Sequence, residues 1–245
     1  MTCDRHHIAS GIADLVFPPV CIVCGHLLRG NRASPFCDEC LSQITFITGP
    51  VCDICGIPFG TQEGETHCCG ACVVDPPPYS CARAVGAYKG ALLEAIHLFK
   101  YRKDAGMGMG KHLGAFMAAW ACDSLSPADY DAVVPVPLHH NRLKERGFNQ
   151  SALLAREIAR TFSLPLDLST LRRKHNRLPQ VGMGRTERRR NTKGVFEVKG
   201  EKNIYRKRLL LVDDVFTTGS TAGECARLLR RHGALEVSVF TLARA

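Results

Sequence analysis

The sequence has no stretch that would carry the chain across a membrane. All of its apolar runs fall well short of the roughly 18 residues that a membrane-spanning helix requires. Residues 12–17 are mostly apolar but include Asp14, and they end at Pro18 and Pro19 without the small-residue cleavage site of a signal peptide. We therefore expect a cytoplasmic protein with no integral membrane segment, in which residues 12–17 belong to a short amphipathic helix.

Aromatic residues are scarce as well, and the histidines do not pair. Phe, Trp and Tyr make up 7% of the chain and form no stripe that would stack on bases, so nothing here supports sequence-specific reading of nucleic acid. The 10 His residues are scattered and lack the paired spacing of metal ligands. We expect them to have structural roles.

Acidic residues are outnumbered, and the excess of positive charge is concentrated in one block. The net charge of the whole chain is +9. Residues 140–193 hold 14 Lys or Arg against 4 Asp or Glu, which gives this block a net charge of +10. A block this basic is either a surface that binds a polyanion or a solvated loop region, and both can hold together.

Cysteine, by contrast, is abundant in one region. Nine of the 13 Cys residues fall between positions 21 and 72, and without an export signal a dense thiol cluster indicates metal rather than disulfides. The predicted zinc ligands form two consecutive quartets, Cys21, Cys24, Cys37 and Cys40, then Cys52, Cys55, Cys69 and Cys72. The two-residue spacing within each pair lets one turn of chain present both thiolates to a single tetrahedral ion.

We interpret the zinc as structural, with one or two ions in the chain. Neither quartet has an open position for catalysis, and metal would supply on the order of 10 kcal/mol of folding free energy per ion. Gly25 and Gly56 follow the second Cys of a pair, where a positive φ is expected. Free or redox-active thiols, a cross-braced pairing of the quartets, and Cys68 in place of Cys69 remain alternatives.

A proline-rich segment divides the chain. Asp75 and the three prolines at 76–78 form a stiff spacer. We predict a small zinc-binding module over residues 1–80, of the double zinc ribbon or knuckle type, and a second domain over residues 81–245. In the second domain strands and helices alternate, which predicts an α/β fold with a parallel sheet and flanking helices.

The periodicity of apolar residues places the elements of this domain. The expected strands cover residues 82–88, 131–137, 195–198, 208–213 and 236–242. The expected helices are one that carries Leu92, Ile96 and Phe99, then residues 113–121, 150–162 and 221–232. Gly106, Gly108 and Gly110 are expected to break the chain before the helix at 113–121, and residues 171–193 are expected to be mostly loop.

Residues 209–221 (LLLVDDVFTTGST) predict a phosphate-binding site. The apolar residues form a buried strand, and Asp213 and Asp214 follow at its carboxyl end, where open α/β sheets bind ligands. The loop then leads into a helix whose first amides and positive dipole end favour an anion. The residues expected to hold the phosphate are Thr217, Thr218, Gly219, Ser220 and Thr221. The two carboxylates can accept hydrogen bonds from ribose hydroxyls or approach Mg²⁺.

This stretch resembles the loop of type I phosphoribosyltransferases that binds phosphoribosyl pyrophosphate (PRPP), with Phe216 at a position where an aliphatic residue is usual. The whole chain resembles the ComF family of competence-associated, phosphoribosyltransferase-like proteins. The resemblance includes the Cys pairs and the segments at 99–102 (FKYR), 134–137 (VPVP), 142–150 (RLKERGFNQ) and 188–191 (RRRN). It implies a type I phosphoribosyltransferase-like sheet preceded by a small zinc-binding module with four-cysteine sites.

The resemblance also implies roles for individual residues. Residues 134–138 would form the loop on the pyrophosphate side, in which one bond before proline, that of Pro135 or Pro137, is expected to be cis. Asp213 and Asp214 would be the catalytic pair. The residues implied to contact pyrophosphate or a nucleic-acid backbone are Pro135, Arg142, Lys144, Arg146, Lys100, Tyr101, Arg188, Arg189 and Arg190. For Lys100 and Tyr101 the alternative is an ordinary helix end, and for the three arginines it is a solvated loop.

Three functions follow as hypotheses, all associated with DNA uptake and natural transformation through the resemblance. The first is a phosphoribosyltransferase that uses PRPP and Mg²⁺. The second is a non-catalytic module that binds single-stranded DNA, and the third is a regulator that senses PRPP. The expected partners are a PRPP-like or nucleotide-like phosphate ligand, single-stranded DNA, and proteins of DNA uptake or recombination. The sequence names neither the acceptor nor the oligomeric state.

Overall fold

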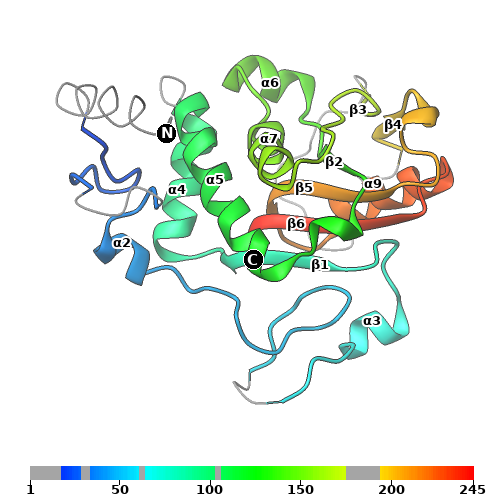
Figure 1. Cartoon of the computed structure of the whole chain (residues 1–245), viewed down its shortest axis with the longest axis horizontal. Coiled ribbons are helices and arrows are strands. Elements are labelled where there is room, and N and C mark those ends of the chain that lie inside the picture. The colour runs from blue at the N-terminus through cyan, green and yellow to red at the C-terminus, as the bar shows by residue number, and fades with distance from the viewer. Residues whose placement is uncertain (1–17, 29–33, 61–63, 103–105, 175–193) are drawn as a thin grey trace, which may run out of the picture.

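The computed structural model describes residues 18–28, 34–60, 64–102, 106–174 and 194–245 (Figure 1). The predicted helix at residues 12–17 lies outside this part of the chain. In the described part, no helix combines the length and the apolar character needed to cross a bilayer.

A four-stranded parallel sheet forms the centre of the protein. Its strands are β1 (Ala82–Ala87), β6 (Glu236–Arg244), β5 (Arg208–Phe216) and β2 (Ala132–Pro135), in that spatial order. The central strands β5 and β6 pair from Arg208 with Glu236 to Phe216 with Arg244. The predicted parallel sheet is confirmed, although β5 continues beyond the predicted end at Asp213 to Phe216.

Helices cover both faces of this sheet, as predicted (Figure 1). The helices α4 (Gly90–Tyr101), α5 (Gly106–Ser124) and α7 (Gln150–Phe162) pack on one face against Leu210 and Val212. The helix α9 (Ser220–Arg231) packs on the other face against Leu209 and Leu211. Successive side chains of a strand point to opposite faces, which explains why four consecutive apolar residues serve two cores.

The helix α5 corrects one prediction, because it runs through the glycines that were expected to break it. These glycines let α5 approach the segment around α7 closely. A Cβ atom at Gly106 would overlap the ring of Phe148, and one at Gly114 would lie 2.8 Å from Cγ of Glu157. The absence of a side chain therefore serves packing between helices here, and the helix is retained despite the low helix propensity of glycine.

We expect Gly114→Ala to lower the free energy of unfolding by about 1–3 kcal/mol, because the new methyl group overpacks the contact with α7. Gly108 is the matched control, since a Cβ atom there would meet nothing within 4 Å. Gly108→Ala should leave stability unchanged or raise it by up to about 1 kcal/mol through helix propensity. Urea unfolding followed by far-UV circular dichroism measures both. Equal effects of the two substitutions would contradict the packing role.

The segment expected to be loop contains one more strand. β3 (Leu171–Arg173) pairs antiparallel with β4 (Phe196–Val198), so the predicted strand near 195–198 is confirmed and the loop prediction is wrong for residues 171–173. The pairing joins segments that are far apart in sequence, which local periodicity does not reveal. Residues 175–193 lie outside the described part. The short helix α6 (His140–Arg146) was also not predicted.

The cysteine-rich region packs along β1 (Figure 1). Ile47 donates a backbone hydrogen bond to Val85, and Ala87 donates one to Thr45. Phe36 and Ile44 belong to the same buried cluster as the helices α4 and α5. The remaining short helices of the described part are α2 (Asp38–Ser42), α3 (Gly70–Val74), η1 (Pro127–Asp129) and η2 (Glu201–Asn203).

Candidate phosphate-binding and zinc sites

The loop between β5 and α9 closes tightly around Gly219. This residue caps α9 with a φ of 72°, in the left-handed region that favours glycine. A Cβ atom there would lie 2.7 Å from the ring of Phe216 and 3.2 Å from the hydroxyl of Tyr79. The hydroxyls of Thr218 and Ser220 are hydrogen-bonded to each other at 2.7 Å. Contacts with Phe216 and Tyr79 and the hydrogen bond between Thr218 and Ser220 therefore restrict the conformation of the loop.

A hollow lies beside this loop at the carboxyl end of β5. It is lined by Asp213, Val215, Phe216, Thr217, Gly219, Ser220, Thr221, Ala222 and Thr241. The first amides of a helix have no partner within the helix, and they carry the positive end of its dipole. The structure thus brings together four of the five predicted phosphate-binding residues at the hollow. The fifth, Thr218, does not line it, and its hydroxyl is hydrogen-bonded to that of Ser220.

Asp213 is held by hydrogen bonds at the edge of the hollow. Its Oδ1 accepts from the hydroxyl of Ser151 at 2.8 Å and from the backbone N–H of Asp214 at 2.9 Å. Burial and then the adjacent charge of Asp214 raise the pKa of Asp213 to about 7, and the two hydrogen bonds only partly oppose the rise. Asp213 therefore exchanges a proton near neutral pH.

The raised pKa has a consequence for stability. The folded chain binds the Asp213 proton more tightly than the unfolded chain, in which the pKa is about 3.9. The contribution of this group is therefore fully present at low pH and is lost as pH rises from about 4 to about 7. We expect Asp213→Asn to gain stability relative to the wild type across this window, measured by urea unfolding at a series of pH values. A pH-independent difference between the two proteins would contradict the assignment.

Asp214 forms an ion pair with Lys100 of the helix α4. The Nζ atom of Lys100, at the end of α4, lies 2.9 Å from its Oδ2, and only 19% and 14% of the two side chains are exposed. The structure thus brings Lys100 to the acidic pair, while its implied contact with pyrophosphate or nucleic acid stays a prediction. The neighbouring Tyr101 lies at the surface, with 67% of the residue exposed.

The proline-containing segment after β2 reaches the same region with ordinary peptide geometry. No cis peptide bond occurs in the described residues, so the expectation of one before Pro135 or Pro137 is wrong. Pro135 belongs to the extended strand β2, and Val136 continues it by donating its N–H to Val212. A trans bond suits this extended backbone. The side-chain amide of Asn149, which caps α7, donates to the carbonyl of Val136 at 3.1 Å.

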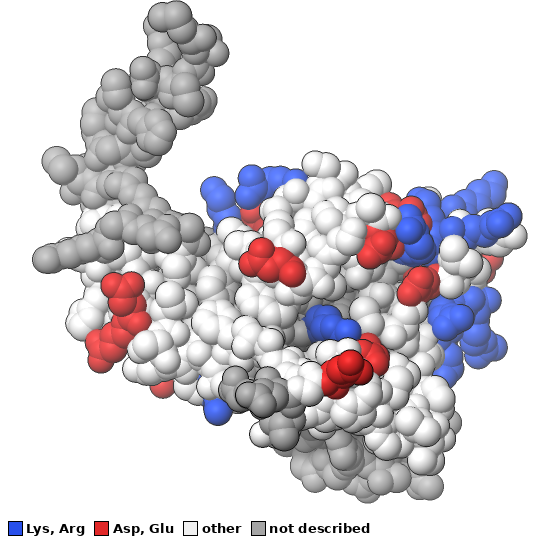
Figure 2. Space-filling model, turned by 60° about the horizontal axis from the view of Figure 1, so that its bottom comes forward, with Lys and Arg blue, Asp and Glu red and all other residues white. Residues whose placement is uncertain are grey.

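The predicted cations of α6 have different surroundings in the structure. Arg146 places its guanidinium over the ring of Tyr101, 5.5 Å from the centroid, and donates to Gln150. Arg142 instead forms an exposed ion pair with Glu145 at 2.9 Å, and Lys144 is exposed. The predicted arginines at 188–190 lie outside the described residues. Figure 2 shows that Lys and Arg also gather at the end of the molecule where Figure 1 places α9 and β4.

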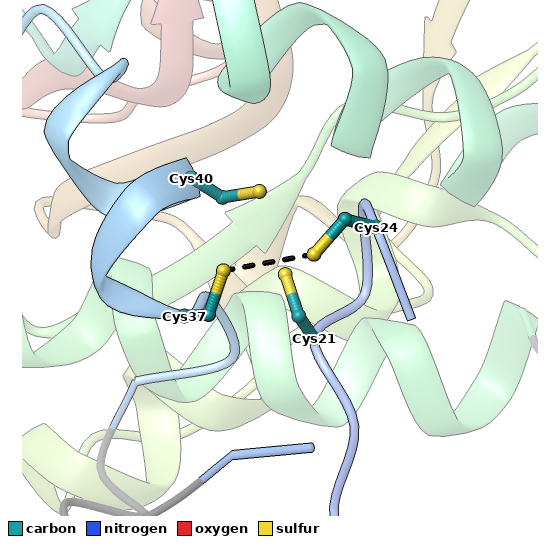
Figure 3. A group of neighbouring side chains, drawn as sticks. All are labelled: Cys21, Cys24, Cys37 and Cys40. Carbon is teal, nitrogen blue, oxygen red and sulfur yellow. Dashed lines mark hydrogen bonds between the residues drawn. The ribbon is translucent and has the colours of Figure 1, made fainter. Parts of the chain in front are cut away.

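The two cysteine quartets form two separate clusters in consecutive order. The first consists of Cys21, Cys24, Cys37 and Cys40, and the second of Cys52, Cys55, Cys69 and Cys72. Within each cluster the four sulfur atoms lie within 4.8 Å of one another. In Figure 3 the four sulfurs of the first cluster approach one another from a turn and from the start of α2. Cys68 is exposed and belongs to neither cluster.

The two clusters repeat one local structure. In each, the first Cys pair occupies a turn closed by an antiparallel bridge, between Val20 and Leu27 or between Val51 and Pro58. The second pair opens a short helix, α2 or α3. Gly25 and Gly56 have φ values of 75° and 70°, which confirms the predicted left-handed turns.

The geometry fits zinc. Four thiolates about 2.3 Å from one ion in a tetrahedron are separated by about 3.8 Å. The Sγ atoms of Cys24 and Cys37 are 3.6 Å apart, and those of Cys55 and Cys69 are 3.8 Å apart. Burial raises the pKa of Cys52, but the backbone N–H groups of Cys69 and Cys55 outweigh this and lower it to about 6. The backbone thus favours the thiolate of Cys52, the form that binds metal, whereas burial raises the pKa of Cys55 and Cys72.

The second cluster contacts the phosphate loop through the last strand. Arg244 of β6 donates to the carbonyl of Cys55 at 2.5 Å and stacks on the ring of Phe216, 4.7 Å from its centroid. Tyr79 packs edge-on against Phe216 with centroids 6.0 Å apart. Because Phe216 also touches Gly219, these side chains connect a zinc ligand with the start of α9.

Sequence reasoning missed three of the residues that shape these sites. Ser151 bonds Asp213, and Tyr79 and Arg244 hold Phe216. Only the cap motif before Ser151 gives a local signal, since an Asn two residues earlier is typical of a helix start. The other two contacts depend on the fold.

Two family models match the chain, and together they define its class. The double zinc ribbon domain matches residues 12–73, and the phosphoribosyl transferase domain matches residues 149–245. The fold is thus that of a type I phosphoribosyltransferase-like domain preceded by zinc ribbons. Among solved structures, a glutamine PRPP amidotransferase from B. subtilis, complexed with ADP and GMP, is 18% identical with a TM-score of 0.43. The similarity covers 60% of this chain and 30% of that one.

Curated relatives match over nearly the whole length. Competence protein F of Haemophilus influenzae is 33% identical over 92% of this chain and 96% of its own length. DNA utilization protein YhgH of Escherichia coli is 31% identical over 94% of this chain and 99% of its own. Competence protein ComFC of Bacillus subtilis is 31% identical over 85% of this chain and 83% of its own length. The chain belongs to the ComF family.

Proposed function

We propose that the end of β5 and the start of α9 bind a ribose 5-phosphate group, either as PRPP with Mg²⁺ or as a nucleotide 5′-phosphate. The observation that carries the proposal is the hollow lined by Asp213, Gly219 and Thr221 at the opening of α9. It combines helix amides for a phosphate with a carboxylate for ribose hydroxyls. Asp214 lies next to Asp213 and completes the acidic pair.

The same residues support transfer of the ribosyl group from PRPP. In this reaction the bond between C1 of ribose and pyrophosphate breaks, both electrons leave with pyrophosphate, and C1 bonds to an acceptor. Mg²⁺ would offset the charge of the pyrophosphate. The carboxylates of Asp213 and Asp214 would stabilise positive charge on the ribose. Lys100, which lies 2.9 Å from Asp214, supplies a cation near the site for the leaving group.

The cellular role that we propose is the handling of DNA taken up during competence, together with proteins of uptake or recombination. The names of the relatives, a competence protein and a DNA utilization protein, support it. The basic residues at the end of the molecule that holds α9 support contact with a polyanion (Figure 2). A protein that binds single-stranded DNA without catalysis is the second candidate, and a PRPP sensor would use the same pocket.

Binding of PRPP tests the proposal directly. PRPP at millimolar concentration with Mg²⁺ should raise the melting temperature of the wild type, because a ligand that binds only the folded state stabilises it. The double variant Asp213→Asn/Asp214→Asn should lose this shift while remaining folded by circular dichroism. Pyrophosphate with Mg²⁺ serves as the control ligand without ribose. AMP represents the nucleotide 5′-phosphate. If neither PRPP with Mg²⁺ nor AMP produced a shift in the wild type, the ribose 5-phosphate site would be refuted.

A further inference from the structure

The second zinc ribbon exposes apolar side chains at a position that the first ribbon keeps covered. Because the two ribbons repeat one structure, Leu41 after the last Cys of the first corresponds to Val73 of the second. Leu41 packs against the buried cluster of α4 and α5, whereas Val73 is 66% exposed and the next residue, Val74, is 86% exposed. In Figure 1, α2 lies beside α4 and α5, while α3, which carries both valines, lies at the lower edge of the molecule.

The open surface belongs to an acidic part of the chain. Residues 33–82 contain six Asp or Glu and no Lys or Arg. The ribbon patch, as we name this surface, consists of the exposed residues Val73, Val74, Asp53, Glu65 and Asp75. Exposed apolar side chains among polar ones are typical of protein contacts, and the negative charge favours a partner rich in Lys and Arg.

An apolar surface with the opposite charge lies at the amino ends of β5 and β6. Tyr205 is 64% exposed and Leu235 is 60% exposed. The segments that carry them run side by side, because the N–H of Leu235 donates to the carbonyl of Lys207 at 2.9 Å. Residues 199–208 and 227–235 together hold eight Lys or Arg against one Glu. This is the end of the molecule where Lys and Arg gather in Figure 2.

The backbone holds this second surface outward. The ring of Tyr205 lies against Gly233, where a Cβ atom would be 2.7 Å from it. Arg206 has a φ of 56°, in the region that favours glycine, so the turn keeps a cation beside the ring despite backbone strain. The basic patch, as we name it, consists of the exposed residues Tyr205, Leu235, Lys202, Arg206, Arg230 and Arg231. None of its four cations forms an ion pair with the described part of the chain.

We propose that the ribbon patch of one molecule docks on the basic patch of a second copy of the chain. Each patch exposes two large apolar side chains, and the charges around them have opposite signs, so the two surfaces complement each other. A contact between two ribbon patches would instead place acid against acid. The docking joins different surfaces, so it closes into a pair when both contacts form reciprocally and otherwise continues into a ring or chain.

Sedimentation velocity of the full-length, zinc-loaded protein tests the contact. In about 50 mM NaCl, the sedimentation coefficient should rise with protein concentration up to about 100 µM, because attraction between exposed charges is little screened. In about 500 mM NaCl the Debye length falls to about 4 Å, and the dissociation constant should rise by about tenfold or more. A wild type that stays monomeric at low salt would overturn the proposal.

Two double variants separate the two surfaces. Val73→Ser/Val74→Ser removes the apolar side chains of the ribbon patch, and Arg230→Glu/Arg231→Glu reverses charge on the basic patch. Each protein alone should be monomeric at low salt, with the circular dichroism spectrum and the zinc content of the wild type. An equimolar mixture should associate again, in pairs held by one intact contact, because each variant supplies the patch that the other lacks. A mixture that stays monomeric would contradict docking between different surfaces.

Val20→Ser/Leu27→Ser is the matched control in the first ribbon. These apolar side chains are about half exposed and belong to neither patch. The control should associate like the wild type, and an equal loss of association in it would refute the role of the ribbon patch. The alternative occupant of the basic patch is a polyanion. If Arg230→Glu/Arg231→Glu still associated but bound a single-stranded oligonucleotide more weakly, the basic patch would serve a polyanion only and the proposal would fail.

Discussion

Gly219→Ala is expected to abolish binding of PRPP at the loop between β5 and α9. Alanine disfavours the φ of 72° by about 1–2 kcal/mol, and its methyl group would lie 2.7 Å from Phe216. The loop can relieve both only by moving, and then the amides that open α9 no longer converge on one point. We expect a loss of at least tenfold in PRPP affinity, measured by isothermal titration calorimetry with Mg²⁺ present.

Gly223→Ala is the control on the same helix. Its Cβ atom would meet only Pro78, at 3.6 Å, which is ordinary contact, and the residue lies within α9. This substitution should preserve PRPP affinity. If Gly219→Ala bound PRPP as tightly as Gly223→Ala does, the phosphate would have to bind elsewhere.

Cys69→Ser is expected to remove one zinc ion and to weaken the phosphate site at a distance. Loss of a thiolate ligand opens the second cluster, whose metal would stabilise the local fold by on the order of 10 kcal/mol. The carbonyl of Cys55 then no longer fixes Arg244, which stacks on Phe216 beside Gly219. We expect the zinc content to fall from two ions to one and the PRPP affinity to fall severalfold. A chromogenic chelator measures the first, and calorimetry measures the second.

The neighbouring cysteine offers a control that differs by one position. Cys68 is exposed and lies outside the cluster, so Cys68→Ser should keep two zinc ions and full affinity. Arg244→Lys tests the contact between the second cluster and Phe216 without removing a zinc ligand. This variant should keep both zinc ions but bind PRPP more weakly. If Arg244→Lys and Cys69→Ser both bound PRPP as tightly as the wild type, the second cluster would have no effect on the phosphate site.

Several features could be predicted because they are encoded locally. The Cys pairs needed only their two-residue spacing, and the phosphate loop is a continuous stretch from Leu209 to Thr221 in which strand, acids and helix start follow one another. The buried strands β1 and β5 were predictable because their runs of apolar residues are read directly from the chain. The sequence left both Cys68 and Cys69 as candidates for the third ligand of the second cluster, because their spacing to Cys72 differs by only one residue. The structure shows that Cys69 belongs to the cluster.

Errors arose where a residue's role depends on a distant partner. The glycines of α5 were interpreted as breakers, yet they fit Phe148 and the helix α7. The strand β3 was missed because its partner β4 follows after a long intervening segment. The expected cis proline was wrong because Pro135 continues an extended strand next to β5. In each case the local pattern allowed two conformations, and packing between remote segments selected one.

By itself the sequence determined which groups are present: two sets of four thiolates, an acidic pair at the end of a buried strand, and a loop of Thr, Gly and Ser that leads into a helix. Only the tertiary structure decided which of these groups meet. It brought Lys100 to Asp214, Arg244 to Cys55, and Arg146 to Tyr101. The physical reason is that spacing along the chain fixes contacts within one turn or one helix, whereas contacts between elements depend on how the sheet orders its strands and how closely its helices pack.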